Sequence, residues 1–142
     1  VDVHLNQLFN MISVMPQEIV VSHLWGNLIE FFEQILPSSK EFQCSISLLS
    51  AIFINFMGKN VELFNPQIAA VCLDNFPPFE RNKTMMFLDG IISLVTNDFP
   101  NEIKAKAIEC INEYLSWNQN RTKFYKVSDE MDSFIVSNFS PQ

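Results

Sequence analysis

The two histidines are the first residues to consider for acid–base or metal chemistry. His4 and His23 are the only histidines in the chain, and they fall on different predicted helices. A histidine that acts as a base or a metal ligand works with a carboxylate, a thiol or a second imidazole nearby. Neither histidine has such a partner at ligand spacing, so we interpret both as structural residues.

Two pairs of carboxylates have a spacing that places both members on one helix face. Glu30 and Glu33 are three residues apart, as are Asp129 and Asp132. Paired carboxylates perform acid–base chemistry when their environments drive their pKa values apart. Because each pair flanks the predicted surface of a helix, the pattern favours a solvated face. We therefore predict that the chain is not an enzyme, with no catalytic residue, no cofactor and no metal.

The three cysteines indicate the compartment. Cys44, Cys72 and Cys110 are odd in number, far apart and embedded in apolar helical patterns, with no CxxC motif. This usage predicts buried free thiols in a reducing compartment, which is the cytoplasm, the nucleus or both. No apolar run approaches the roughly 18 residues that span a bilayer, and residues 1–4 do not resemble a signal peptide. We expect no membrane partner.

Three triplets match the acceptor sequence for N-glycosylation. They begin at Asn82, Asn120 and Asn138. Such triplets matter in secreted proteins. In an asparagine-rich chain with unpaired cysteines, we interpret them as chance occurrences.

The charge balance bears on the choice of partner. The formal net charge is −7, from 16 acidic and 9 basic residues. The one basic cluster comprises Arg121, Lys123 and Lys126, with Phe124 and Tyr125 interleaved. Three charges supply little affinity for phosphates, so we interpret the cluster as a solvated loop and expect no nucleic-acid partner. The acidic surface favours solubility, and it also suits basic protein partners.

Helices are the elements that must position all of these residues. The chain has 142 residues, which is the size of a single domain spanning 1–142, and only 3 glycines. Its 14 phenylalanines bury apolar area without a polar group that needs a partner. Apolar residues recur in steps of three and four throughout. They predict about seven amphipathic helices, over residues 3–15, 17–36, 39–57, 65–76, 80–97, 101–117 and from 128 onward.

Residues with known capping preferences define the predicted helix ends. Ser38 and Ser39 are predicted N-caps, and Gly58 is predicted to close the helix that follows them. Asn65 precedes a proline at the first helical position, and Ser128 is predicted to cap the last helix. Short connections make neighbouring helices antiparallel, so the pattern predicts a series of helical hairpins.

Three of the predicted helices share a proline at their start. Pro37, Pro77 and Pro100 each open a helix, and aliphatic residues follow each proline after eleven and fifteen positions. A helical hairpin that repeats at roughly 40 residues is typical of HEAT-type α-solenoids. The shared register predicts these core residues: Phe53, Leu88, Ile92, Ile111 and Leu115.

Residues 24–33 carry one family resemblance. They read Leu-Trp-Gly-Asn-Leu-Ile-Glu-Phe-Phe-Glu, and the Trp-Gly and Phe-Phe-Glu portions resemble a BH1 segment of Bcl-2-like proteins. This resemblance implies a closed helical bundle that binds a partner helix in a groove. One predicted helix precedes the segment, whereas several precede it in that fold. We keep this function as the alternative.

Two other segments resemble HEAT-repeat proteins of the karyopherin-β family, the importins and exportins. Residues 48–66 are similar to a repeat helix, a polar break and the start of the next helix. Residues 105–117 end in Tyr-Leu-Ser-Trp and are similar to an exportin-type inner helix. The resemblance implies a role in nucleocytoplasmic transport, with cargo or a Ran-type GTPase as partner, and it identifies no binding residue.

The sequence as a whole predicts an all-α protein, a HEAT-like α-solenoid segment of antiparallel hairpins. An extended surface made from successive helices suits a protein–protein interaction scaffold, and it encloses no small-molecule pocket. We therefore expect other proteins, and basic ones in particular, as partners.

Overall fold

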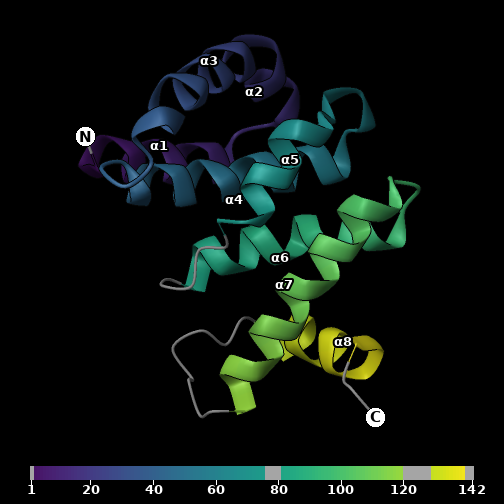
Figure 1. Cartoon of the computed structure of the whole chain (residues 1–142). Helices are drawn as coiled ribbons and strands as arrows, with labels where there is room; N and C mark the ends of the chain where they lie inside the picture. The colour runs from purple at the N-terminus through teal and green to yellow at the C-terminus, as the bar shows by residue number, and fades with distance from the viewer. Residues whose placement is uncertain (1, 76–80, 120–128, 140–142) are drawn as a thin grey trace. The chain divides into compact units, whose positions relative to one another are not determined.

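The fold is all-helical, as the sequence predicts. The computed structural model describes residues 2–75, 81–119 and 129–139. These residues form eight α-helices and two single-turn 3-10 helices, with no strand among them (Figure 1). The elements are α1 (Asp2–Val14), α2 (Gln17–His23), α3 (Trp25–Ile35), η1 (Leu36–Ser38), α4 (Gln43–Lys59), η2 (Val61–Leu63), α5 (Pro66–Leu73), α6 (Arg81–Thr96), α7 (Asn101–Gln119) and α8 (Asp129–Phe139).

The chain divides into two compact units, Val1–Leu49 and Ser50–Gln142, and we describe each by itself. The boundary falls inside α4, so the first turns of that helix belong to one unit and the remainder to the other. None of the described helices combines the length and the apolar character that a membrane span requires.

In the first unit, the single helix predicted over residues 17–36 is wrong. The chain leaves helical geometry at Leu24, where φ is −117° and ψ is −27°, and this residue separates α2 from α3. The amide of Leu24 still donates to the carbonyl of Val20 at 2.9 Å, and the amide of Leu28 donates to Leu24 at 2.9 Å. Val20 and Leu28 are both buried. The apolar steps of four therefore continue across the break, and periodicity alone does not reveal it.

The predicted serine caps before α4 are also wrong. Ser38 belongs to η1, and its carbonyl accepts the amides of Glu41 and Phe42 at 3.0 and 3.1 Å. These bonds form a turn, and α4 begins only at Gln43. The serines and Glu41 thus belong to the turn, because local hydrogen bonds of this kind compete with the start of a helix.

Helix α4 is buried on every face, whereas the sequence analysis expected an amphipathic helix. Every residue from position 45 to position 58 is buried. A helix that is apolar all round is typical of the interior of a protein. Four polar residues interrupt this stretch, namely Ser45, Ser47, Ser50 and Asn55. The Asn55 amide donates to the carbonyl of Met86 at 2.9 Å and to a carboxylate oxygen of Asp89 at 3.3 Å.

In the second unit, α4 and α6 cross at two glycines. A Cβ atom on Gly58 would lie 2.6 Å from the carbonyl oxygen of Gly90, and one on Gly90 would lie 2.5 Å from that of Ile54. The backbones therefore touch at a distance that no other residue permits. The prediction that Gly58 closes its helix is wrong. Gly58 is buried within α4 because its missing side chain makes room for α6.

The contacts of the second unit follow a regular register. Along α4, Asn55 and Lys59 bond to Met86 and Asp89 of α6, and Gly58 approaches Gly90, so α4 and α6 run in the same sense where they cross. Helix α7 packs against α5, α6 and α8. Helices α4 and α6 thus pair with each other, and α5 pairs with α7 (Figure 1).

The predicted start of α5 is confirmed. The side chain of Asn65 accepts the amides of Gln67 and Ile68 at 3.0 and 3.2 Å, and Pro66 occupies the first helical position. Just before this cap, the ring of Phe64 packs on the ring of Phe99 with centroids 5.0 Å apart. The predictions for Pro77, Pro78 and Ser128 lie outside the described residues.

Four of the five predicted core residues are buried. Phe53, Leu88, Ile111 and Leu115 lie in the core, whereas Ile92 is only half-buried. The prediction that a proline opens a helix is confirmed at Pro100, which directly precedes α7. It fails at Pro37, which belongs to η1, six residues before α4 begins. Pro77 lies outside the described residues.

Candidate functional site

The structure places the two histidines on separate helices. His4 lies on α1, and His23 is the exposed last residue of α2. Among the described residues, no group of three or more His, Cys, Asp or Glu side chains could hold a metal ion.

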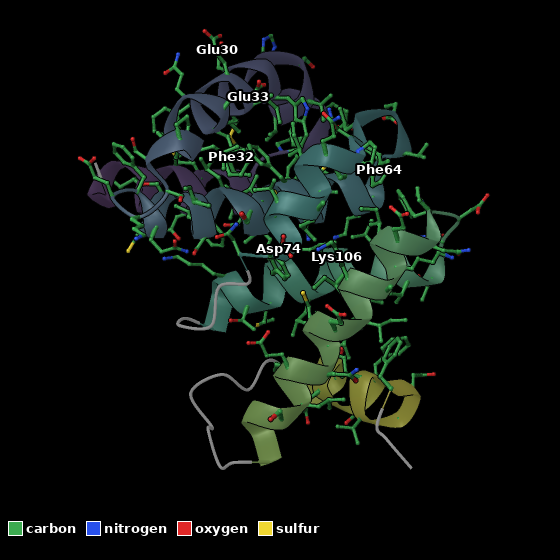
Figure 2. All side chains as sticks on the ribbon, viewed as in Figure 1. Glu30, Phe32, Glu33, Phe64, Asp74 and Lys106 are labelled. Carbon is green, nitrogen blue, oxygen red and sulfur yellow. The ribbon has the colours of Figure 1, made fainter. Side chains whose placement is uncertain are left out.

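The first carboxylate pair lies on the exposed surface of α3. Glu30 and Glu33 are both exposed (Figure 2), and they line a shallow hollow of about 340 Å³. All the residues of that hollow come from α3 itself. The two carboxylates therefore lie on a single exposed helix surface, as the sequence pattern predicted.

The two carboxylates of the second pair lie in different surroundings. Asp129 is exposed at the start of α8, whereas Asp132 accepts a hydrogen bond from the Tyr114 hydroxyl at 2.9 Å. Tyr114 is fully buried on α7. Asp132 therefore holds α8 against α7 by satisfying a buried phenol, which is a structural role.

Two of the three thiols are buried, as predicted. Burial raises the pKa of Cys72 to about 12. Burial also raises the pKa of Cys110 to about 12, and nearby carboxylates, first among them Glu113, add to the rise. The Cys110 thiol donates to the carbonyl of Leu73 at 3.3 Å. Both groups are therefore unreactive neutral thiols at physiological pH.

The prediction that Cys44 is buried is wrong. Cys44 is exposed. It is the second residue of α4, one position before the buried stretch begins. The apolar pattern extends smoothly from Phe42 into α4, so the sequence does not show where burial starts.

The remaining sequence candidates contribute no site. The basic cluster of Arg121, Lys123 and Lys126 lies outside the described residues, as does Asn120. Asn82 lies in the first turn of α6. Asn138 is exposed on α8, and its side-chain amide donates to the carbonyl of Phe134 at 2.8 Å.

A surface that the sequence analysis did not single out is the exposed face of α7. Helix α7 buries one side against α5, α6 and α8. Its opposite side carries exposed residues in steps of three and four, namely Glu102, Ala105, Ile108, Glu109, Asn112, Glu113 and Ser116. Ile108 leaves 41% of its surface exposed on this side of the helix, which also carries three carboxylates. We call these seven residues the α7 face.

An exposed ion pair joins α7 to the end of α5. The Lys106 ammonium lies 3.0 Å from a carboxylate oxygen of Asp74, which directly follows α5 (Figure 2). The hydrogen bond to Asp74 and the charge of that carboxylate raise the pKa of Lys106, and the charge of Glu109 adds to the rise. Lys106 is four residues after Glu102 and three before Glu109, so it borders the α7 face and offsets part of its negative charge.

The second unit also contains a groove, formed where α4 and α6 end. Its volume is about 540 Å³. We call it the C-terminal groove, and its lining residues are Gly58, Lys59, Val61, Glu62, Ser93, Asn97, Asp98 and Phe99. Val61 leaves 68% of its surface exposed there. No sequence pattern marked this groove, because its two walls are more than 30 residues apart along the chain.

In the described part of the chain, the buried thiols of Cys72 and Cys110 are neutral. The features that stand out are two open surfaces on the second unit, the α7 face and the C-terminal groove. Comparisons of the chain with protein-family models, with curated proteins and with solved structures found no match.

Proposed function

We propose that this chain is a protein-interaction module that binds basic partner proteins through the α7 face. The observation that carries the proposal is a helix fixed on one side and open on the other. Three helices pack against one side of α7, while Glu102, Glu109, Glu113 and Ile108 stay exposed on the other. Interfaces between proteins combine apolar and charged side chains in this way.

The charge of the module supports the choice of a basic partner. The net charge of the chain is −7. Complementary charge speeds the encounter of two proteins and suppresses binding of acidic competitors. The exposed Ile108 then supplies apolar area that a partner can bury, which long-range charge alone does not provide.

The register of the second unit supports an α-solenoid as the architecture of this module. Helix α4 pairs with α6 in the same sense, and α5 pairs with α7. Stacked helical hairpins bring like helices together in this way, and they present successive helices on one extended surface. The narrower role in nucleocytoplasmic transport, with cargo or a Ran-type GTPase, stays a prediction from the resemblance of residues 48–66 and 105–117.

One observation favours the second candidate, a closed bundle. Helix α4 is buried on every face from position 45 to position 58. A central buried helix is typical of a closed bundle, whereas helices of a solenoid usually keep one face open. In that case the module would bind a partner helix in a groove, as the resemblance of residues 24–33 implies. Both candidates make the chain a binding module, and the buried thiols of Cys72 and Cys110 favour a reducing compartment for either.

The test of the proposal is affinity capture with two matched charge variants. The test variant is Glu102→Lys/Glu109→Lys/Glu113→Lys, which reverses the α7 face. The control variant is Glu18→Lys/Glu30→Lys/Glu33→Lys, which reverses three exposed carboxylates of the first unit. Each variant replaces three negative charges by three positive ones, so each changes the formal net charge from −7 to −1.

We expect the wild-type chain and the control variant to capture basic proteins at low salt and to release them at high salt. The test variant should lose the same proteins. Each captured protein is then purified and mixed with the chain to measure a binary dissociation constant. Equal losses for both variants would show that only net charge matters. Capture by all three proteins alike would remove the α7 face from consideration, and capture of a single amphipathic helix would favour the closed bundle.

A further inference from the structure

The C-terminal groove lies where two helices end. Lys59 is the last residue of α4, and Thr96 is the last residue of α6. The final turn of a helix carries a partial negative charge, since its last carbonyls have no partner within the helix. Two such ends meet here because α4 and α6 run in the same sense past Gly58 and Gly90.

Side-chain amides satisfy only part of these helix ends. The Asn60 amide donates to the carbonyl of Phe56 at 3.0 Å, and the Asn97 amide donates to that of Ser93 at 2.9 Å. The same two carbonyls also accept the backbone amides of Asn60 and Asn97, at 2.9 and 3.1 Å, so each side chain adds a donor to a carbonyl that already has one. The later carbonyls of each last turn have no donor within the helix. A partial negative charge therefore persists at this end of the unit.

The carboxylates of the groove add to that charge. Glu62 follows α4 and Asp98 follows α6, and both are exposed. The one lysine in the lining, Lys59, is already bonded to the carboxylate of Asp89. Within the described residues, neither Glu62 nor Asp98 has an ion-pair partner. The carboxylates of the groove therefore give it a negative charge that no ion pair among the described residues offsets.

Apolar side chains line the same groove. Val61 is 68% exposed, and the ring of Phe99, supported by Phe64, contributes to the lining. The volume of about 540 Å³ lies within the range of roughly 300–1,000 Å³ that is usual for ligand pockets. It is large enough for a few residues of an extended peptide, with a long aliphatic stem against Val61; Phe99 is only 7% exposed and forms the base of the groove.

We propose that the C-terminal groove binds a short extended segment of a partner protein in which Lys or Arg alternates with an apolar residue. The cation lies between Glu62 and Asp98, opposite the two helix ends, and the apolar residue covers Val61. Arginine and lysine suit this arrangement because they pair a charged head with an apolar stem. This inference deepens the proposed function and rests on it, since it gives the module a second contact with the same basic partner.

The experiment measures binding of a fluorescein-labelled peptide in which arginine and leucine alternate, by fluorescence anisotropy. The test variant is Glu62→Gln/Asp98→Asn. The control variant is Glu18→Gln/Glu41→Gln, which removes the same charge from exposed positions of the first unit, outside both the groove and the α7 face. We expect the test variant to bind the peptide about tenfold more weakly than the wild type, from two surface charge pairs. The control variant should bind within about twofold of the wild type.

Peptide composition gives a second measurement. Replacing leucine by serine should weaken binding, because Val61 then stays exposed, and a peptide of alternating glutamate and leucine should not bind. In a ¹⁵N-labelled sample, the amide signals of residues 58–62 and 93–99 should shift on titration, while those of α3 should stay in place. If both variants bind the peptide equally weakly, or if amide signals shift over the whole surface, net charge alone explains the binding and the inference is wrong.

The two proposals fail separately in these experiments. If the arginine–leucine peptide does not bind, or binds the groove variant as well as the wild type, the groove inference fails while capture through the α7 face can persist. If capture of basic proteins does not depend on the α7 face but the peptide still requires Glu62 and Asp98, the proposed function fails and the groove is a peptide site of its own.

Discussion

Replacing Gly90 by alanine should destabilise the protein, although alanine is the better helix former. Gly90 lies in the middle of α6, where α4 crosses it. A Cβ atom there would lie 2.5 Å from the Ile54 carbonyl oxygen, and 2.6 Å from both the Cα and the amide nitrogen of Asn55. All three atoms belong to the backbone of α4, so no side chain can rotate away to relieve the clash.

The size of the effect follows from two opposing contributions. Ordinary contacts of a Cβ atom begin at 3.4 Å, so the two helices must separate by close to 0.9 Å at the crossing, the difference between 3.4 and 2.5 Å. Overpacking of this kind costs about 1–3 kcal/mol, and we take the upper end because backbone opposes backbone. Alanine gains about 1 kcal/mol over glycine in helix propensity. The net loss in the free energy of unfolding is therefore about 2 kcal/mol.

Gly26→Ala is the matched control for this prediction. Gly26 also lies in a helix, but a Cβ atom added there has no other atom within 4 Å. The same substitution should therefore stabilise the protein by about 0.5–1 kcal/mol, since only the propensity changes. Urea unfolding followed by circular dichroism at 222 nm measures both variants. If Gly90→Ala is as stable as the wild type, or if both variants change in the same direction, the close crossing of α4 and α6 is wrong.

Three further expectations concern the core, the thiols and a helix cap. Leu88→Ala should cost about 2–5 kcal/mol in urea unfolding because Leu88 is fully buried, whereas Ile108→Ala should cost much less; equal losses would contradict the burial of α6 and the openness of the α7 face. Cys44 should react with a disulfide reagent in the native state within minutes, and Cys72 only on unfolding; a common rate for both would contradict their different exposure. The pKa of Cys72 is about 12 in the folded protein and 9.0 for an unburied thiol. Between these pH values the thiol loses its proton only in the unfolded chain, so the free energy of unfolding should decrease as the pH increases. Cys72→Ala should make this decrease with pH smaller. Asn65→Ala should cost about 0.5–2 kcal/mol through loss of the cap of α5, and an unchanged unfolding midpoint would mean that the two amides find other acceptors.

The sequence predicts the helices well and their termini unevenly. Apolar periodicity locates the helical segments, because the spacing of buried residues is a local property, but it merges α2 and α3 into one helix. Asn65 is recognisable as a cap, since Pro66 at the next position allows only a helix start or a turn. The break at Leu24 is invisible, because a single residue leaves helical geometry while Val20 and Leu28 keep their helical spacing.

Local sequence patterns cannot predict features that depend on contacts between distant parts of the chain. Gly58 looks like a helix end, because glycine often follows one, and its true role depends on Gly90, which lies 32 positions later. The C-terminal groove likewise joins residues after α4 with residues after α6. Two short clues were available, an acidic residue a few positions after each of two helix ends. Only the crossing of the helices brings Glu62 and Asp98 to one groove.

The buried stretch of α4 bears on how sequences related to this one can diverge. Fourteen successive positions, 45 to 58, have no side to which a larger or charged residue could point without displacing a neighbour. Mutations there face purifying selection at every codon, whereas a typical helix can drift freely along its outer half. The order of small and large residues from Ser45 to Gly58 should thus outlast the identity of the exposed residues on α7. A distant relative would be recognised by α4, long after its partner-binding surface had changed.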